Sequence, residues 1–256
     1  MPALSRPPNL KSLVRSALEL LLPLNCVGCR REGHVLCPEC TAGLRRLEPP
    51  YCDVCAEPGV TGRCGDCRTR PPKLDGIRAP YLFEGDIRET IHRLKYRGWR
   101  VAAPVLGRML ADYLKHHQLQ VQTTGPAGAN GPVRLEDSVL VPVPLHHRRL
   151  RRRGYNQSLL LAREAGRSLD LPVRDDLLVR AEDRPPQVDT RSQAERRENV
   201  ARSFQAAGPG SSDIQGMSIL LIDDVATTGS TLSACAEALR SAGAASVWGL
   251  VLARDR

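Results

Sequence analysis

Aromatic residues are scarce in this sequence, and long hydrophobic runs are missing. Phe, Trp and Tyr together make up 4% of the 256 residues, which leaves few side chains on which the bases of a single-stranded nucleic acid can stack. No segment approaches the roughly 20 consecutive apolar residues that a membrane-spanning helix needs. We therefore expect no membrane span, and any binding of single strands would have to rely mainly on charge.

A recognisable secretion signal is also missing. Apolar residues recur at helical spacing over residues 10–22 and the pattern ends at Pro23. A secretory signal is the alternative to a helix here, but Glu19 interrupts the apolar run and no small-residue cleavage site follows. We therefore expect residues 1–25 to be a lead-in containing a docking helix, and the protein to be cytoplasmic.

Net charge and chain length limit the class of ligand and the number of domains. The chain carries 37 Lys and Arg residues against 28 Asp and Glu residues, which gives a formal net charge of +9. This balance favours polyanionic ligands such as a nucleic acid or a pyrophosphorylated sugar. The hydrophobic content of 41% and the charged content of 25% are typical of a soluble globular protein. The length allows one domain with a small module, or two domains.

Eight of the nine cysteines form four Cys-x-x-Cys pairs in the N-terminal part of the chain. The pairs are Cys26 and Cys29, Cys37 and Cys40, Cys52 and Cys55, and Cys64 and Cys67. Each pair can supply half of a tetrahedral Zn²⁺ shell. A disulfide scaffold is the alternative, but without a secretion signal we expect a reducing compartment, where this spacing indicates metal.

The second four cysteines repeat the spacing of the first four almost unchanged. The repeat favours two consecutive Cys₄ sites, at 26–40 and 52–67, although a cross-braced pairing also fits the spacing. Neither segment has enough apolar residues for a core, so zinc would supply most of the folding energy. Four thiolates leave no open coordination position, which makes both sites structural. We expect residues 26–70 to form a double zinc-ribbon module, with His34 on its surface.

The segment 218–231 carries the strongest signal for a binding site. Its apolar start suits one buried strand of a parallel sheet, and it is closed by Asp223 and Asp224. A hydroxyl-rich loop with one glycine follows, and helical spacing begins near Leu232. In open α/β sheets, ligands bind beyond the carboxyl ends of strands. The backbone N–H groups at the start of the following helix can hold a phosphate.

This block resembles the phosphoribosyl-pyrophosphate (PRPP) motif of type I phosphoribosyltransferases. The resemblance implies that Asp223 and Asp224 are catalytic residues that position the ribose or Mg²⁺. It also implies a 5′-phosphate loop, formed by Ala226, Thr227, Thr228, Gly229, Ser230 and Thr231. The simpler alternative is a buried strand that ends in a capped turn. However, two acids and four hydroxyl residues within nine positions are more than a cap needs.

An arginine-rich segment follows a second predicted strand at 138–144. Five of the six residues at 148–153 are arginines, and helical spacing resumes at 159–169. A solvated basic face or a nucleic-acid patch is one interpretation. We favour a pyrophosphate site, because the run follows a strand in the same chain as the phosphate loop and Arg binds such groups in bidentate geometry.

Taken together, the motifs resemble the ComF family, which has the phosphoribosyltransferase fold and is linked to DNA uptake in natural competence. The matching segments are the cysteine pairs, 94–98, 141–145, the arginine-rich turn and 154–157. The resemblance implies a pyrophosphate loop made of Arg148, Arg149, Arg153, Gly154, Tyr155, Asn156 and Gln157. It also implies flap or acceptor contacts from Lys95, Tyr96, Gln187, Arg197 and Asn199.

The alternation of predicted strands and helices indicates an α/β fold, with a doubly wound, mostly parallel sheet over residues 71–256. We expect PRPP with Mg²⁺ as the ligand and transfer of phosphoribose to a nitrogen acceptor, although no side chain is an evident general base. The alternative is a non-catalytic protein that binds single-stranded DNA. The family resemblance admits single-stranded DNA and helicase-type competence proteins as partners beside PRPP. Cys235 is expected in the core rather than as a nucleophile.

Overall fold

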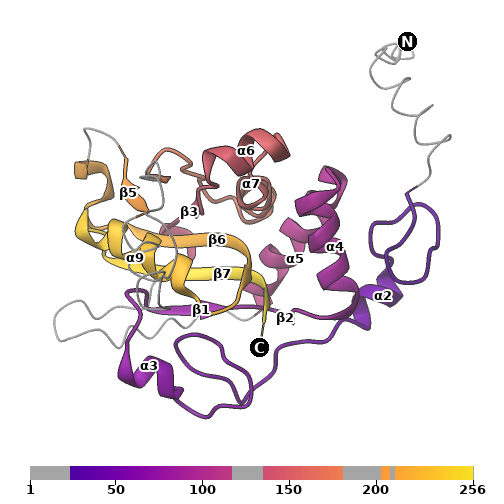
Figure 1. Ribbon diagram of the computed structural model, residues 1–256, viewed down its shortest axis with the longest axis horizontal. Coiled ribbons are helices and arrows are strands. Elements are labelled where there is room, and N and C mark those ends of the chain that lie inside the picture. The colour runs from indigo at the N-terminus through magenta and orange to yellow at the C-terminus, as the bar shows by residue number, and fades with distance from the viewer. Residues whose placement is uncertain (1–23, 117–134, 181–202, 208–210, 256) are drawn as a thin grey trace, which may run out of the picture. The chain divides into compact units, whose positions relative to one another are not determined.

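The computed structural model describes residues 24–116, 135–180, 203–207 and 211–255 (Figure 1). The chain forms two compact units, Met1–Leu44 and Arg45–Arg256. The first unit contains the first four cysteines and the short helix α2 (Pro38–Ala42). The helix predicted at 10–22 lies outside the described residues.

In the second unit, strands and helices alternate along the chain. The strands are β1 (Gly76–Arg78), β2 (Tyr81–Leu82), β3 (Ser138–Pro142), β4 (Leu178–Arg180), β5 (Phe204–Ala206), β6 (Ser218–Ala226) and β7 (Ser246–Arg254). The α-helices are α3 (Gly65–Thr69), α4 (Gly85–Tyr96), α5 (Ala103–His116), α6 (His147–Arg153), α7 (Gln157–Leu169) and α9 (Ser230–Ser241). Short 3₁₀ helices are η1 (Arg100–Ala102), η2 (Leu135–Asp137) and η3 (Ser211–Ile214).

Five of the described strands form one parallel sheet, in the order β1-β7-β6-β3, with β2 also paired to β7. The central position of β7 fits its burial, because every residue of this strand is buried. The predicted α/β fold with a parallel sheet is confirmed. Strands β4 and β5 form a separate antiparallel pair, and the sequence analysis had not identified β4.

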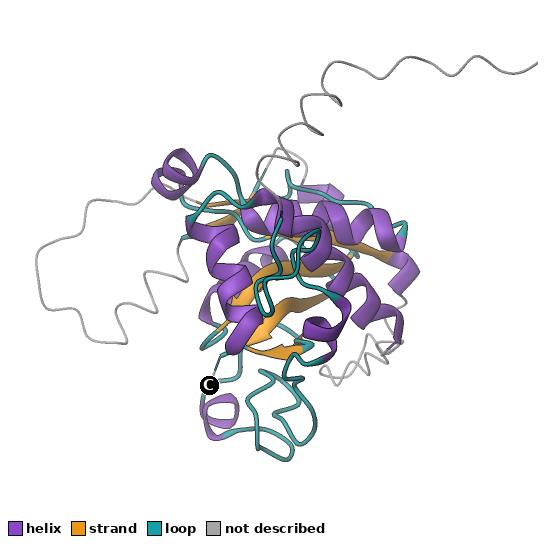
Figure 2. Cartoon of the chain, turned by 90° about the vertical axis from the view of Figure 1, so that its right-hand side faces the viewer, coloured by secondary structure: helices purple, strands orange, loops and turns teal. Residues whose placement is uncertain are grey.

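Helices lie on both faces of the sheet (Figure 2). On one face, Ile219 of β6 and Val247 of β7 share a hydrophobic core with Leu232 of α9. On the other face, α7 packs near Leu140 of β3, and α5 packs against α7. A Cβ atom on Gly107 of α5 would lie 2.4 Å from a side-chain carbon of α7, so only glycine permits this close approach.

The sheet begins with β1 at Gly76, before the short β2. One strand boundary differs from the prediction. Strand β6 does not end before the acidic pair, because Asp223, Val225 and Ala226 still pair with β7. Asp223 and Asp224 therefore lie on strand β6, whose backbone is paired with β7.

The arginine-rich segment was predicted to be a turn, and this prediction was wrong, because the segment forms helix α6. His146 caps the start of the helix through Nδ1, which accepts a hydrogen bond from the Arg148 N–H at 3.1 Å. Gly154 ends the helix in the left-handed conformation at φ 76°. Arginine is itself a good helix former, and these two caps make a seven-residue helix possible. No helix in the described part of the chain is both long and apolar enough to cross a membrane.

Candidate functional site

The carboxyl ends of β3 and β6 lie side by side. Pro142 is paired with Ile222, and the Val143 N–H donates to the Ile222 carbonyl at 3.0 Å. This register brings the segment that follows β3 to the edge of the sheet where Asp223 and Asp224 lie. Such an edge is where open α/β sheets bind their ligands.

Asp223 is tied to the start of α7. Its Oδ1 accepts hydrogen bonds from the Ser158 hydroxyl at 2.8 Å and from the Asp224 N–H at 2.9 Å. Burial raises the pKa of Asp223 to about 7, and the Asp224 carboxylate adds to this increase, whereas Ser158 and Lys95 act to lower the pKa. A ligand that donates hydrogen bonds to Asp223 would favour its charged form.

Asp224 is almost fully buried and pairs with a cation from helix α4. Its Oδ1 lies 2.8 Å from Lys95 Nζ at the end of α4, and the exposed fractions of the two side chains are 3% and 19%. Among the described residues, nothing forms a hydrogen bond with Asp224 Oδ2, which is also buried. A buried carboxylate oxygen without a partner is expensive, and a ligand hydroxyl or a hydrated Mg²⁺ fits the unfilled acceptor.

The turn between α6 and α7 is fastened to the end of α4. The Tyr155 hydroxyl donates to the Leu94 carbonyl, and Arg100 donates to the Gly154 carbonyl at 3.1 Å while lying 4.5 Å above the Tyr155 ring. Asn156 holds the other side of the turn, because its Nδ2 donates to the Val143 carbonyl at 3.0 Å. Three predicted groups (94–98, 154–157 and the acidic pair) therefore converge on one region.

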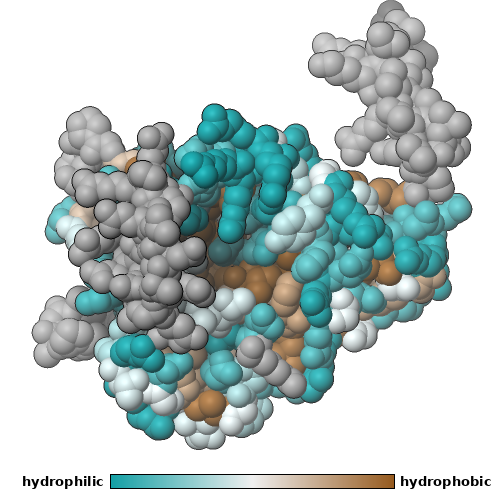
Figure 3. All heavy atoms as spheres, in the orientation of Figure 1, coloured by the Kyte–Doolittle hydropathy of each residue, from teal (hydrophilic) through white to brown (hydrophobic). Residues whose placement is uncertain are grey.

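One arginine of α6, Arg153, contacts residues near the acidic pair, whereas others are exposed to solvent. Arg153 donates to Gln157 and lies 5.5 Å from the exposed ring of Tyr96. Arg148 and Arg149 are exposed on α6, and Figure 3 shows a hydrophilic cluster over this helix. Gln187, Arg197 and Asn199, which were predicted as flap contacts, lie outside the described residues.

The loop after β6 has the form of an anion site. Gly229 adopts φ 72° and caps α9, a helix of 12 residues. Thr228 Oγ1 lies 2.7 Å from Ser230 Oγ and accepts from the Ser230 N–H at 3.3 Å. Because Thr227 and Thr228 are exposed, the loop presents hydroxyl groups at a helix N-terminus, where a phosphate is favoured.

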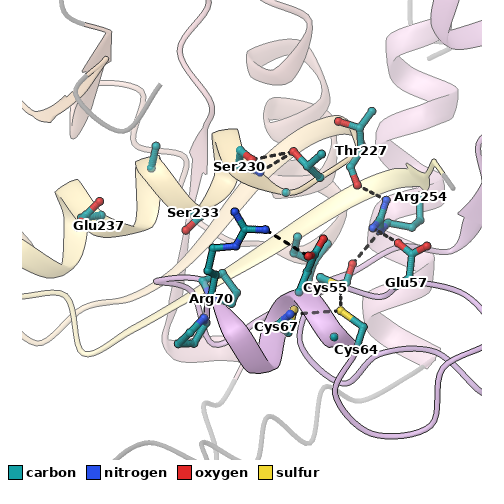
Figure 4. A pocket seen from close by; sticks show the side chains of 18 residues that line it. Cys55, Glu57, Cys64, Cys67, Arg70, Thr227, Ser230, Ser233, Glu237 and Arg254 are labelled. Carbon is teal, nitrogen blue, oxygen red and sulfur yellow. Dashed lines mark hydrogen bonds and ion pairs between the residues drawn. The ribbon is translucent and has the colours of Figure 1, made fainter. Parts of the chain in front are cut away.

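This loop also borders a cavity of about 650 Å³ (Figure 4). One wall comes from the loop and α9, including Thr227, Ser230 and Ser233. The other wall comes from the second cysteine set and the residues after it, including Cys64 and Arg70. The second metal site and the phosphate loop are therefore neighbours in the same unit.

The cysteines gather in two consecutive sets. Within each set, one at 26, 29, 37 and 40 and the other at 52, 55, 64 and 67, the ligand atoms lie within 4.8 Å of one another. This grouping agrees with the favoured consecutive pairing and not with cross-bracing. In both sets a backbone N–H points at a sulfur: Cys37 N–H at Cys26 Sγ (3.3 Å), and Cys64 N–H at Cys52 Sγ (3.2 Å).

These N–H groups favour the thiolate form that zinc requires. Burial acts to raise the pKa of Cys52, but the backbone N–H groups of Cys55, Cys64 and Val54 outweigh it and lower the pKa to about 7. Each set of four sulfurs forms a closed Cys₄ site that fits structural Zn²⁺. His34 is exposed, and Cys235 is fully buried, as predicted.

Comparisons with known proteins agree with this arrangement. Residues 17–68 match the double zinc ribbon domain, and residues 156–256 match the phosphoribosyl transferase domain. Competence protein F of Haemophilus influenzae is 30% identical over 240 residues, covering 89% of this chain and 96% of the relative. The chain belongs to the ComF family.

Other relatives of this ComF-family chain carry similar names. DNA utilization protein YhgH of Escherichia coli K12 is 30% identical over 89% of this chain and 96% of its own length. Competence protein ComFC of Bacillus subtilis is 27% identical over 86% of this chain and 84% of its own length. A solved glutamine PRPP amidotransferase from B. subtilis is 21% identical, with a TM-score of 0.35, over 59% of this chain and 26% of its own.

The structure also shows residues at this candidate site that could not be recognised from the sequence. Ser158, which holds Asp223, directly follows Gln157 and carries no signal of its own. From the sequence, Lys95 was predicted only as a flap or acceptor residue, whereas in the structure it pairs with Asp224. The one signal for this pairing was the charge of Lys95 within a family motif, because a buried carboxylate needs a cation.

Proposed function

We propose that this protein binds PRPP together with Mg²⁺ at the edge of the sheet where β3 and β6 end. In this proposal Asp223 and Asp224 receive the ribose hydroxyls, and the loop from Ala226 to Thr231 holds the 5′-phosphate. The turn from Arg153 to Gln157, together with α6, binds the pyrophosphate. Two structural zinc ions complete the protein, and its unpaired cysteines suit the cytoplasm.

The observation that carries the proposal is the buried Asp224 Oδ2, which has no hydrogen-bond partner in the described part of the chain. Lys95 neutralises the carboxylate through the other oxygen, so the site needs a neutral donor or a hydrated cation at Oδ2. A sugar hydroxyl is such a donor, and Mg²⁺ held by the same sugar and its pyrophosphate would add to the neutralisation.

The site supports transfer of phosphoribose to a nitrogen acceptor. In this reaction the bond between C1 of the ribose and the pyrophosphate oxygen breaks, a C1–N bond forms, and the proton of the nitrogen passes to water. Positive charge develops on the ribose beside Asp223 and Asp224, and negative charge develops on the leaving group beside Arg153. Fixed charges in these places stabilise the transition state.

We also propose a role in DNA uptake, because the H. influenzae relative is a competence protein. A helicase-type competence protein is the predicted protein partner. PRPP binding would then serve or regulate this process.

Calorimetric titration of Mg-PRPP into the zinc-loaded protein tests the proposal. We expect saturable binding, and we expect Asp224→Asn to weaken it by about 10- to 100-fold, the effect of one hydrogen bond to a charged group. Asp213→Asn, which changes an exposed carboxylate on η3, serves as the matched control. Equal affinity of the wild type and a folded Asp224→Asn variant would contradict the site.

A second candidate function is binding of single-stranded DNA. The observation that favours it is the exposure of Arg148, Arg149, Arg151 and Arg152 on one short helix. Titration of an oligonucleotide at several salt concentrations tests it, because affinity falls with salt and each lost phosphate contact makes the negative slope of log affinity against log salt less steep by about 0.7 for single strands. We expect Arg149→Ala with Arg152→Ala to flatten this slope; an unchanged slope would exclude α6 from the DNA path.

A further inference from the structure

Arg254, near the end of β7, connects the second cysteine set with the phosphate loop. The residue is only 4% exposed. Its Nη1 donates to the carbonyls of Ala226, at 3.2 Å, and of Thr227. Its Nε donates to the Cys55 carbonyl at 2.9 Å, and its Nη2 forms an ion pair with Glu57. Figure 4 shows Arg254 between Thr227 on one side and Cys55 and Glu57 on the other.

The backbone of the second metal site is attached to the sheet at three consecutive carbonyls. The Asp53 carbonyl accepts from Arg78 at 3.0 Å, the Val54 carbonyl accepts from the Ile77 N–H at 2.6 Å, and the Cys55 carbonyl accepts from Arg254 at 2.9 Å. Asp53 and Val54 lie in the turn between two zinc ligands, Cys52 and Cys55, and the third carbonyl belongs to Cys55 itself. The direction of their carbonyls therefore depends on the conformation that the four sulfurs impose on this turn.

We propose that Arg254 is a positioning residue that transmits the zinc occupancy of the second cysteine set to the phosphate loop. The inference rests on the proposed binding of a phosphorylated sugar at that loop. By fixing the carbonyls of Ala226 and Thr227, Arg254 sets the orientation of the peptide groups whose N–H side faces the anion. The second zinc site thus controls the affinity for the 5′-phosphate from a distance.

The chemistry of the guanidinium group explains why arginine occupies this place. Arginine offers five donors in a planar fork, so a single side chain can hold carbonyls from two chain segments and a carboxylate at once. A lysine at position 254 would keep the charge but lose the fixed fork. The carbonyls on at least one side would then lose their donor.

Loss of zinc from the second cysteine set would remove two of the partners of Arg254, the Cys55 carbonyl and the Glu57 carboxylate. In the segment 52–67, Ala56 packs into the main core, and the other apolar contacts are a small cluster of Val54 and the partly buried Val60 with the cysteines, so most of its conformation depends on the metal. Without that conformation, both Cys55 and Glu57 leave Arg254. The guanidinium is then free to turn toward other acceptors, and the Thr227 carbonyl loses the Arg254 donor, while the Ala226 carbonyl keeps its hydrogen bond from the Asp255 N–H.

Two matched cysteine variants test this coupling in the full chain. Cys67→Ser removes a ligand of the second set, and Cys40→Ser removes the corresponding ligand of the first set, which lies in the unit Met1–Leu44. Each variant should lose about one zinc ion, measured by atomic absorption. Hydrogen exchange of the amides at 226–231 is then compared in the absence of ligand.

We expect exchange in the loop to accelerate by about tenfold or more in Cys67→Ser and to match the wild type in Cys40→Ser. Equal protection in all three proteins would overturn the proposal, and so would equal loss of protection in both variants. This arm does not involve PRPP, so its outcome is independent of the proposed function.

Arg254→Lys provides the second arm. We expect it to keep both zinc ions, to accelerate exchange at 226–231, and to weaken Mg-PRPP binding by about tenfold, which corresponds to about 1.4 kcal/mol. If Arg254→Lys does not fold, Glu57→Gln removes only the ion pair and should shift the same readouts by a smaller factor. Unchanged loop exchange in the folded variant would overturn the role of Arg254. If the wild type itself does not bind Mg-PRPP, only the proposed function fails.

Discussion

The substitution Asp223→Asn tests two effects of the Asp223 carboxylate, its binding of the ligand and its contribution to the free energy of unfolding. In the folded protein, burial and the neighbouring Asp224 carboxylate raise the pKa of Asp223 from 3.8 to about 7. The folded state therefore binds the Asp223 proton more tightly than the unfolded chain does. The resulting stabilisation is complete below pH 3.8 and is lost as the pH rises through about 7.

The size of this loss follows from the two pKa values. One pKa unit corresponds to about 1.4 kcal/mol, so the wild type is destabilised by up to about 4 kcal/mol at pH 8.5. About half of this loss has already occurred at pH 5.5. Asparagine keeps an Oδ1 acceptor for Ser158 and for the Asp224 N–H, but it carries no charge. The variant should therefore become more stable than the wild type, with an advantage that grows by about 2 kcal/mol between pH 5.5 and pH 8.5.

Urea unfolding of the zinc-loaded proteins at these two pH values measures the difference. Asp213→Asn is the control, because a surface substitution usually changes the free energy of unfolding by no more than about 0.5 kcal/mol. At pH 8.5, Asp223→Asn should also bind Mg-PRPP more weakly, since an acceptor for the ribose loses its charge. A free-energy difference between Asp223→Asn and the wild type that does not change with pH would refute the reasoning.

Three further predictions concern the packing around the site. Lys95→Met leaves the Asp224 carboxylate buried without its cation and should lower the free energy of unfolding by about 3 kcal/mol; an unchanged urea midpoint would contradict this. Gly229→Ala places a Cβ atom 2.9 Å from the Ile77 side chain at φ 72°, and should lower the free energy of unfolding by about 1–2 kcal/mol and weaken Mg-PRPP binding in calorimetry. Gly107→Ala forces α5 away from α7 and should lower the melting temperature by at least about 3 °C, with calorimetric PRPP affinity unchanged.

The sequence predicted the features that depend on local pattern. The apolar run at 218–222 identified β6, one of the two inner strands of the sheet, and the hydroxyl-rich loop after it lies at the start of α9, as expected. The repeated cysteine spacing predicted the two metal sites, because four thiols at such intervals have few other arrangements. The order of these motifs also identified the family before any relative was compared.

Features that depend on tertiary contacts were not predictable in the same way. Strand β1 has only three residues, too few for a hydrophobic period to be recognised. Helix α6 was interpreted as a turn because a helix composed almost wholly of arginine shows no apolar face. The roles of Ser158 and Arg254 arise from segments that meet only in the folded chain, and Arg254 looks like an ordinary basic residue at the end of an apolar strand.

The place of β7 in the sheet has a consequence for how the protein folds during synthesis. This strand is the last of the described strands in chain order, yet it lies between β1 and β6. Until β7 leaves the ribosome, the β1 segment has no partner on this side, and the pairing of β3 with β6 exposes an open edge. Such edges promote aggregation of nascent chains. We therefore expect newly made chains to depend on chaperones until Arg254 has emerged, and the second zinc site to dock last.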